Sequence, residues 1–327
     1  MQTNTIQACI LKKTQLSQRV VGLTLAATDG VDLPSWEPGA HIELTLDIPG
    51  YEDGDEKCYR QYSLCGDTKN LKTWEIAVLK DDESRGGSKF IHEALKEGDV
   101  ITVSEPKNHF AFKGGDHCLF IAGGIGITPI YAMIAEAKEA NVDWELLYLA
   151  RNNQDFIFLE QIKAIDADRV TIHASSEKGK YLLQNKLDSL PENTVVYSCG
   201  PQSLLDALEE MHQQQKTSKW QLVLERFKVD APVIDESAEK PIFVTLSRTG
   251  KTIEVPADES ILEALRKEGV RIKCSCRNGT CGTCETVVIS GVPDHRDHVL
   301  SEEEKEANET MMLCVSRAIS DELVLDL

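Results

Sequence analysis

The stretch Cys276-Arg277-Asn278-Gly279-Thr280-Cys281-Gly282-Thr283-Cys284 decides how the C-terminal part of this chain folds, and Cys314 follows at a distance. Its spacing is C-x4-C-x2-C…C, the arrangement that holds plant-type [2Fe–2S] clusters. Two irons bridged by two sulfides need four thiolates, so a loop supplies three and a remote segment supplies the fourth. Gly279 and Gly282 lack a Cβ, which lets the backbone wrap closely and aim N–H groups at the sulfurs. We therefore expect Cys276, Cys281, Cys284 and Cys314 to bind iron.

A structural zinc site is the alternative for these cysteines. Zinc sites usually pair two short C-x2-C knuckles, whereas this chain has one such knuckle and a solitary Cys314. The pattern favours the iron–sulfur cluster. Cys274 lies two residues before the first expected ligand and outside the C-x4-C-x2-C spacing, so it is expected to be a packed thiol without a metal role.

The segments around the cysteine loop predict a separate small domain. A polar connector, residues 228–240, contains two prolines and few large apolar residues and is interpreted as a linker. After it come a hairpin-like pair of strands, 242–246 and 252–255, a helix over 261–268 and a terminal strand over 322–327. We predict an α+β ferredoxin domain of the β-grasp type over residues 241–327.

Strands and helices alternate in the middle of the chain. Predicted strands cover 118–122, 145–150, 170–174, 195–198 and 222–224, and predicted helices cover 128–140, 156–165 and 204–215. This order indicates a parallel sheet with helices on its faces, over residues 113–227. The uncharged run from Cys118 to Ala135 is long enough for a membrane span, but its glycines and Pro129 favour a buried strand, a turn and a helix instead.

Two glycine turns of this middle region are candidate dinucleotide contacts. One contains Gly123, Gly124, Gly126, Thr128 and Pro129, and the other is Cys199-Gly200-Pro201. Each follows a strand and opens a helix, where backbone N–H groups can approach a pyrophosphate at the carboxyl edge of the sheet. The first turn is not G-x-G-x-x-G, so the ordinary dinucleotide fingerprint does not apply, and a plain tight turn is the alternative.

The first third of the chain reads as short strands, 20–27, 41–46, 61–64, 73–79 and 100–103, with a short helix over 88–95. This spacing predicts an antiparallel β-barrel over residues 1–112. Within it, Arg60-Gln61-Tyr62-Ser63 offers a planar cation for a phosphate and a ring for an isoalloxazine. Glycines and a hydroxyl before a helix make an anion site, and the segment that provides them consists of Arg85, Gly86, Gly87 and Ser88. Together the two segments indicate a phosphorylated flavin.

The composition excludes several classes of partner. The chain has 327 residues and a formal net charge of −19, which disfavours nucleic acid and anionic membranes and is compatible with a basic protein partner. The N-terminus shows no secretory pattern, so the ten cysteines fit a reducing cytoplasm better than a disulfide framework. We expect Cys9, Cys58, Cys65 and Cys118 to be buried or partly buried thiols.

In combination, these motifs resemble the phthalate dioxygenase reductase family, the FMN-containing, plant-type ferredoxin reductases of Rieske oxygenases, a group that includes vanillate demethylase reductases. The resemblance covers essentially the whole chain and includes Glu225-Arg226-Phe227 and His295-Arg296-Asp297. It implies FMN, since no adenine-holding segment for FAD is evident. It also implies that Thr128 lies near the flavin, that Cys199 nears the nicotinamide, that Phe227 shields the flavin face and that Arg151 lies beside the dinucleotide.

The resemblance further implies an oxidoreductase that takes a hydride from NADH to the flavin and passes electrons singly through the cluster to a terminal Rieske oxygenase. Ser175-Ser176-Glu177-Lys178-Gly179-Lys180 departs from members that prefer NADH, which often carry acids here. NADH is the expected donor, and NADPH stays open. A di-iron hydroxylase as acceptor and, in another class, a redox-sensing regulator are the alternatives. We expect a cytoplasmic monomer whose transient oxygenase contact is steered electrostatically by glutamates 302, 303, 304 and 306.

Overall fold

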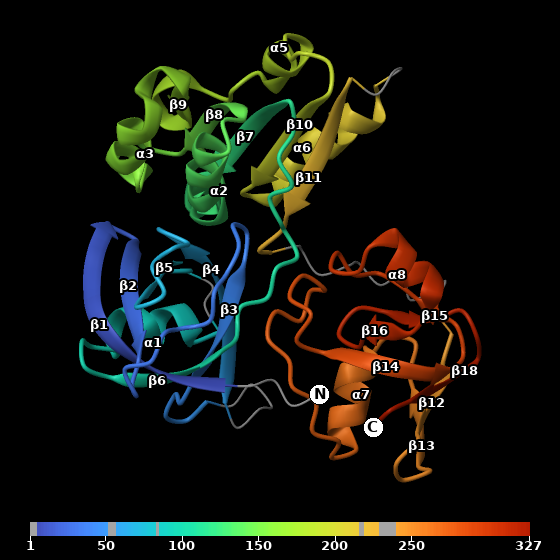
Figure 1. Cartoon of the computed structure of the whole chain (residues 1–327). Helices are drawn as coiled ribbons and strands as arrows, with labels where there is room; N and C mark the ends of the chain where they lie inside the picture. The colour runs from blue at the N-terminus through green and yellow to red at the C-terminus, as the bar shows by residue number, and fades with distance from the viewer. Residues whose placement is uncertain (1–4, 52–56, 83–84, 216–218, 229–239) are drawn as a thin grey trace. The chain divides into compact units, whose positions relative to one another are not determined.

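The computed structural model describes residues 5–51, 57–82, 85–215, 219–228 and 240–327. Contacts divide the chain into two units, residues 1–49 with 59–226, and residues 50–58 with 227–327. The first unit holds a β-barrel and a parallel sheet, and the second holds a mixed sheet and the cysteine loop (Figure 1). Of the predicted linker, only Lys228 and Lys240 lie within the described residues.

The predicted antiparallel barrel is confirmed. Its six strands close in the order β1-β2-β5-β4-β3-β6. They are β1 (Thr5–Ser17), β2 (Val20–Ala27), β3 (His41–Leu46), β4 (Cys58–Cys65), β5 (Trp74–Leu79) and β6 (Val100–Ser104), with α1 (Gly87–Glu93) between the last two. Leu25, Leu44, Leu64 and Trp74 are fully buried in it, because alternate residues of each strand face the interior.

Strand β1 was not predicted, and its irregularity explains why. Its pairing with β2 shifts between Ile10 and Lys12 and again between Gln15 and Ser17, so the apolar alternation is reset within one strand. Lys13, in the polar part of this strand, donates its ammonium group to the Ile91, His92 and Leu95 carbonyls at the end of α1. The side chain of a polar strand residue therefore caps the C-terminal end of α1.

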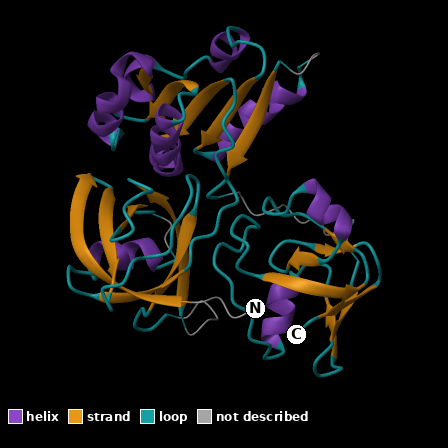
Figure 2. Cartoon of the chain, in the orientation of Figure 1, coloured by secondary structure: helices purple, strands orange, loops and turns teal. Residues whose placement is uncertain are grey.

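The predicted parallel sheet is also confirmed, in the order β11-β10-β7-β8-β9. Its strands are β7 (His117–Gly123), β8 (Asp143–Ala150), β9 (Val170–Ala174), β10 (Thr194–Cys199) and β11 (Trp220–Glu225). Every described pair in it is parallel. Separate apolar clusters cover its two faces, and Figure 2 shows the helices flanking the strands. The uncharged run from Cys118 to Ala135 becomes β7, a turn and the start of a helix.

The helices of this sheet are α2 (Ile127–Glu139), α3 (Leu159–Asp166), α4 (Ser175–Lys178), α5 (Leu183–Asp188) and α6 (Gln202–Gln213), with single turns η1 (Gly124–Gly126), η2 (Asn153–Asp155) and η3 (Ala167–Arg169). The predicted start of α3 at Phe156 was wrong. Phe158 has a left-handed backbone, with φ of 58°, and a right-handed helix cannot continue back through it. No helix of the described chain is long and apolar enough to cross a membrane.

The second unit contains a mixed sheet in the order β13-β12-β18-β14-β16. Its strands are β12 (Ile242–Leu246), β13 (Thr252–Val255), β14 (Glu285–Ser290), β16 (Thr310–Met312) and β18 (Glu322–Leu325). A small pair, β15 (Pro293–Asp294) and β17 (Arg317–Ala318), stands apart from it. Helix α7 (Ile261–Lys267) buries Ile261, Leu262 and Leu265 in the core of this unit, and α8 (Glu302–Ala307) contacts β16. This is the predicted β-grasp domain.

Candidate functional site

The two predicted glycine turns lie against each other at the carboxyl edge of the parallel sheet. Strands β7 and β10 are neighbours, with Ala122 opposite Cys199. A Cβ on Gly126 would lie 2.1 Å from the Cys199 carbonyl oxygen, and a Cβ on Gly200 would lie 2.9 Å from the Gly123 Cα. Only glycine permits this approach of backbone to backbone. The turns thus form one continuous main-chain edge, where a dinucleotide could lie close to N–H groups.

The start of α2 completes this edge. The Thr128 hydroxyl donates to the Ile125 carbonyl at 3.0 Å, and the side chain is buried. Pro129 occupies the first turn of the helix, where the missing N–H costs no helical hydrogen bond. Gly124, with φ of 55°, turns the chain into α2. Thr128 is therefore held by the turn, and its predicted proximity to the flavin stays a prediction.

Cys199 faces a residue to which the sequence alone assigned no role. Glu225 lies opposite Cys199 in the register of β10 and β11, and the two side chains are hydrogen-bonded. Burial raises the pKa of Glu225 to about 8. Burial, and then the charge of Glu225, raises the pKa of the Cys199 thiol. The Glu225 Oε2 atom is buried without a hydrogen-bond partner within the described chain, which is unusual for a polar atom and is consistent with a ligand group there.

The residues that follow Glu225 have different environments. Arg226 donates to Asp206 at 2.8 Å and to Glu209 at 2.6 Å, both on α6, and its own side chain is buried. It joins the end of β11 to that helix, so its role here is structural. Phe227 is 39% exposed, and its contact with a flavin stays a prediction.

The two predicted flavin segments, 25 residues apart, are in contact in the barrel. Arg60 on β4 donates to the Arg85 carbonyl at 3.2 Å and to the Tyr59 carbonyl at 2.7 Å. Gly87 lies against the Arg60 side chain, since a Cβ there would come within 2.6 Å of the Arg60 Cγ. The backbone turn at Gly86, with φ of 96°, precedes α1. A planar cation and a glycine turn therefore adjoin, which suits a phosphate group.

The hydroxyl groups of Ser88 and Ser63 in these segments differ in their hydrogen bonding. The Ser88 Oγ accepts the Asp81 N–H at 3.1 Å, so it braces the turn. Ser63 is buried, and its Oγ has no hydrogen-bond partner among the residues described. Tyr62 is partly buried beside it. An unpartnered buried hydroxyl on β4, the strand that carries Arg60, fits a segment that binds a polar cofactor.

The four expected ligands of the cysteine loop come together in pairs. The Cys276 thiol is hydrogen-bonded to Cys281 and Cys314, and Cys284 is hydrogen-bonded to Cys314. The bonds from Cys281 and Cys314 hold the pKa of Cys276 well below its usual range. In the described residues, no three His, Cys, Asp or Glu side chains are placed to hold one metal ion. Paired thiols are instead what a two-iron cluster requires.

Backbone geometry supports the same site. The N–H groups of Asn278 and Thr280 donate to the Cys276 sulfur, and the Cys276 N–H donates to the Cys281 sulfur, each at 3.4 Å. Gly279 has φ of 73°, and a Cβ there would lie 2.7 Å from a Val315 methyl group. Cys274 belongs to the apolar core, and its sulfur accepts from the Arg266 guanidinium at 3.0 Å. Its predicted packing role is confirmed.

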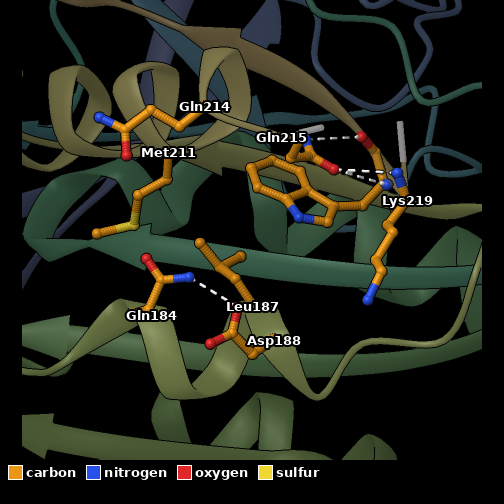
Figure 3. Close-up of a pocket in the computed structure, with 8 residues that line it drawn as sticks. Gln184, Leu187, Asp188, Met211, Gln214, Gln215 and Lys219 are labelled. Atoms are coloured by element: carbon orange, nitrogen blue, oxygen red, sulfur yellow. Dashed lines mark hydrogen bonds between the residues drawn. The ribbon is translucent and has the colours of Figure 1, made fainter. Parts of the chain in front are cut away.

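Arg151 and the cysteines outside the loop are the remaining residues singled out by the sequence. Arg151 is exposed directly after β8, and its carbonyl accepts the Ser176 N–H at 2.9 Å. Cys9 is partly buried, and Cys58, Cys65 and Cys118 are buried thiols outside any disulfide, as expected. A surface pocket of about 300 Å³ lies between α5, α6 and the start of β11. Gln184, Leu187 and Met211 are among its lining residues (Figure 3). It is at the amino end of β11, and no predicted site residue lines it.

Comparisons with known proteins agree with this arrangement. A model of the 2Fe-2S iron-sulfur cluster binding domain matches residues 244–318, and a model of the oxidoreductase NAD-binding domain matches residues 120–210. The carnitine monooxygenase reductase subunit of Escherichia coli (strain K12) is 36% identical over 95% of this chain and 95% of its own. The phthalate 4,5-dioxygenase oxygenase reductase subunit of Pseudomonas putida is 35% identical over 97% of this chain and 95% of its own.

A solved structure gives the same result. Phthalate dioxygenase reductase, described as a modular structure for electron transfer from pyridine nucleotides to [2Fe–2S], is 34% identical. It covers 99% of this chain and is itself covered over 98%, with a TM-score of 0.68. The predicted fold class, oxidoreductase activity and pairing of an NAD-binding domain with a [2Fe–2S] domain are confirmed. The chain belongs to the phthalate dioxygenase reductase family.

Proposed function

We propose that this chain is the reductase component of a Rieske-type oxygenase or demethylase and passes electrons from NADH through FMN and a [2Fe–2S] cluster to the terminal oxygenase. One observation carries the proposal. A glycine edge suited to a dinucleotide and a loop with four paired thiols occur in one chain. When bound, the flavin and the cluster supply the conversion of a two-electron donor into one-electron transfers.

In the nicotinamide domain, the protein binds the dinucleotide and orients it. The edge formed by Gly123, Gly126 and Gly200 receives the pyrophosphate, because it exposes main chain without side chains. Cys199 and Glu225 border the nicotinamide in a dry environment, and the Glu225 carboxyl keeps its proton at neutral pH. Hydride transfer itself needs no acid or base, so orientation and exclusion of water are the contributions of these residues.

At the flavin end, the barrel binds a phosphate and a ring. Arg60, with Arg85, Gly86, Gly87 and Ser88, holds the phosphate of FMN, and Tyr62 and Ser63 contact the ring system. Thr128 and Phe227 border the flavin from the nicotinamide side of the site. Arg151 borders the dinucleotide. The observed contact between Arg60 and Gly87 supports the phosphate site.

Cys276, Cys281, Cys284 and Cys314 would hold the cluster through their four thiolates. Three hydrogen-bonded contacts already join these thiols, Cys276 with Cys281, Cys284 with Cys314, and Cys276 with Cys314, and they support this ligand set. The N–H groups that point at Cys276 and Cys281 stabilise the reduced, more negative cluster and so raise its potential.

Three modules make up the proposed chain: a flavin domain over residues 1–112, a nicotinamide domain over 113–227 and, beyond the linker 228–240, a ferredoxin domain over 241–327. A fragment ending at residue 227 should oxidise NADH with ferricyanide but fail to reduce cytochrome c, which takes its electrons from the cluster. Full cytochrome c activity in the fragment would show that the flavin reaches acceptors directly.

The terminal oxygenase contact is proposed to be brief, and the reductase monomeric and cytoplasmic. None of the ten cysteines, all of which lie within the described residues, forms a disulfide, which suits a reducing compartment. The deciding experiment measures bound cofactors and turnover together. Purified protein should carry one FMN, two irons and two labile sulfides, and should support NADH-dependent turnover of a Rieske oxygenase expressed with it. FAD in place of FMN, zinc in place of iron, or turnover only with a di-iron hydroxylase would contradict the proposal.

A further inference from the structure

The carboxyl ends of β8 and β9 continue the edge on which the glycine turns lie. Gly123 at the end of β7 pairs with Leu149 of β8, and Ala150 of β8 pairs with Ala174 of β9. Arg151 and Ser175 are the next residues of their strands and therefore adjoin. A dinucleotide with its pyrophosphate on the glycine turns extends its adenosine ribose along this edge, where side chains distinguish a free 2′-hydroxyl from a 2′-phosphate.

The charged residues here are mostly cations. Arg151, Lys178 and Lys180 are exposed, and Glu177 is the acidic side chain of the segment 175–180. The chain as a whole has a net charge of −19, so this edge differs in sign from the rest of the molecule. A cationic edge attracts a phosphate dianion and has little effect on a neutral hydroxyl.

The one acid of this segment is engaged by a neighbouring turn. The Asn153 side-chain amide donates to the Glu177 Oε1 at 2.5 Å. Asp155, also close in sequence, accepts from the backbone and side-chain amides of Asn152. Both carboxylates are therefore bound to amide groups of the protein. The position directly after β9 carries Ser175, a hydroxyl that can donate to a phosphate and places no negative charge there.

The segment is also fixed in place. The Ser176 N–H donates to the Arg151 carbonyl at 2.9 Å, and the Gly179 N–H donates to the Ser175 carbonyl at 3.0 Å. His173 is hydrogen-bonded through its Nε2 to the Gly179 carbonyl at 2.8 Å. Arg151 and Ser175 thus hold a defined separation, and ordering them for a ligand costs little conformational entropy.

We propose that this chain accepts NADPH as well as NADH, with the 2′-phosphate bound by Arg151 and Ser175 and attracted by Lys178 and Lys180. The inference rests on the proposed nicotinamide site and adds a subsite to it. A guanidinium can bind a phosphate through two parallel N–H bonds. The same Ser175 hydroxyl can serve a free ribose hydroxyl, so NADH is retained.

The first test uses the holoprotein in anaerobic stopped flow, with flavin reduction followed separately for NADH and NADPH. We expect second-order rate constants within about tenfold of each other, since each 1.4 kcal/mol is a factor of ten. Ser175→Asp should lower the NADPH value at least tenfold more than the NADH value, because it places a carboxylate beside the phosphate. Lys163→Ala, which removes a half-buried lysine of α3 that pairs with Glu160, is the matched control and should leave the ratio unchanged.

A binding measurement separates this inference from the proposed function. By calorimetry, 2′,5′-ADP should bind more tightly than 5′-AMP, and Arg151→Ala should remove the difference. This readout does not depend on flavin reduction, so it stands even if neither nucleotide reduces the flavin, an outcome that would defeat the proposed function alone. Equal affinity for 2′,5′-ADP and 5′-AMP would overturn the NADPH subsite. So would a rate constant of flavin reduction by NADPH below one hundredth of the rate constant for NADH.

Discussion

The glycine edge of the parallel sheet and the cysteine loop of the ferredoxin domain are built in opposite ways. At the edge, Gly126 packs against the Cys199 carbonyl, a residue 73 positions away, and main chain touches main chain. In the loop, three of four thiols come from nine consecutive residues, and nearby N–H groups meet the sulfurs at 3.4 Å. The first site depends on the absence of side-chain atoms, and the second depends on the presence of particular ones. They should therefore fail through different substitutions.

The largest effect is expected from Gly126→Ala. Its Cβ would lie 2.1 Å from the Cys199 carbonyl oxygen, so the two turns must separate. A displacement of about 1 Å at a positioning edge can lower rates on the order of 100-fold. We expect at least that loss in NADH-driven flavin reduction, measured by stopped flow, with the spectrum of the reduced cluster unchanged.

Gly124→Ala is the matched control for this prediction. Gly124 has φ of 55°, and a Cβ added there would meet no atom of the described chain within 4 Å. Alanine at this position therefore costs about 1–2 kcal/mol of backbone strain and no collision. Equal losses in both variants would mean that strain, and not the contact with Cys199, governs the edge.

Next in size is the loss of the cluster. Cys314→Ser should leave iron below one half of the parent content and abolish the low-temperature resonance of the reduced cluster, because one iron loses a thiolate. Ferricyanide reduction by NADH should persist. Cys274→Ser is the control, since its sulfur accepts from Arg266 in the core. A resonance lost in Cys274→Ser and kept in Cys276→Ser would reverse the ligand assignment.

A smaller effect concerns Glu225, which belongs to the glycine edge. Its carboxyl has a pKa of about 8 in the folded chain, against an ordinary value of 4.5. Between these values the unfolded state binds fewer protons, so the free energy of unfolding falls as pH rises, and it levels off above pH 8. The decline contributed by this group is at most about 1.4 kcal/mol per pH unit.

Glu225→Gln should remove that slope, as measured by urea denaturation from pH 5 to pH 9. Glu160→Gln, on the exposed surface of α3, should keep it. A slope identical in Glu225→Gln and the parent chain would show that the Glu225 carboxyl is ionised throughout.

The smallest effect is expected on the surface of α8. Glu302, Glu303 and Glu306 are exposed there, while the Glu304 carboxylate caps the helix by accepting the Ser301 N–H at 2.8 Å. We therefore test the three other glutamates. If they steer the oxygenase, oxygenase turnover should fall as salt shortens the Debye length from about 30 Å at 0.01 M to about 10 Å at 0.1 M.

Replacing these three glutamates by glutamine should lower oxygenase turnover at low salt by a factor of about two to ten, and so flatten its salt dependence. Flavin reduction by NADH should stay unchanged. The matched control replaces Glu210, which lies on α6 of the parallel-sheet domain. If the triple variant and the parent have the same salt dependence, the glutamates of α8 contribute to solubility and do not steer the oxygenase.

Much of the architecture was readable from the sequence. Strands β2, β3, β9, β12 and β13 have the predicted bounds, because each is a run of regular apolar alternation or continuous apolar residues between turn residues. Strand β1 was missed, since two register shifts break its alternation. The start of α3 was misplaced, because the left-handed backbone of Phe158 has no signal in its residue type.

The sequence by itself determined the chemistry of the cysteine loop, since the spacing of nearby ligands is a local property and Gly279 and Gly282 accompany it. Only the tertiary structure decided that Gly126 meets Cys199, that Arg60 lies on Gly87 and that Glu225 is buried beside a thiol. These features depend on neighbours supplied by remote strands. The pKa of Glu225 has the same origin, because burial and hydrogen bonding arise only when β10 and β11 pair.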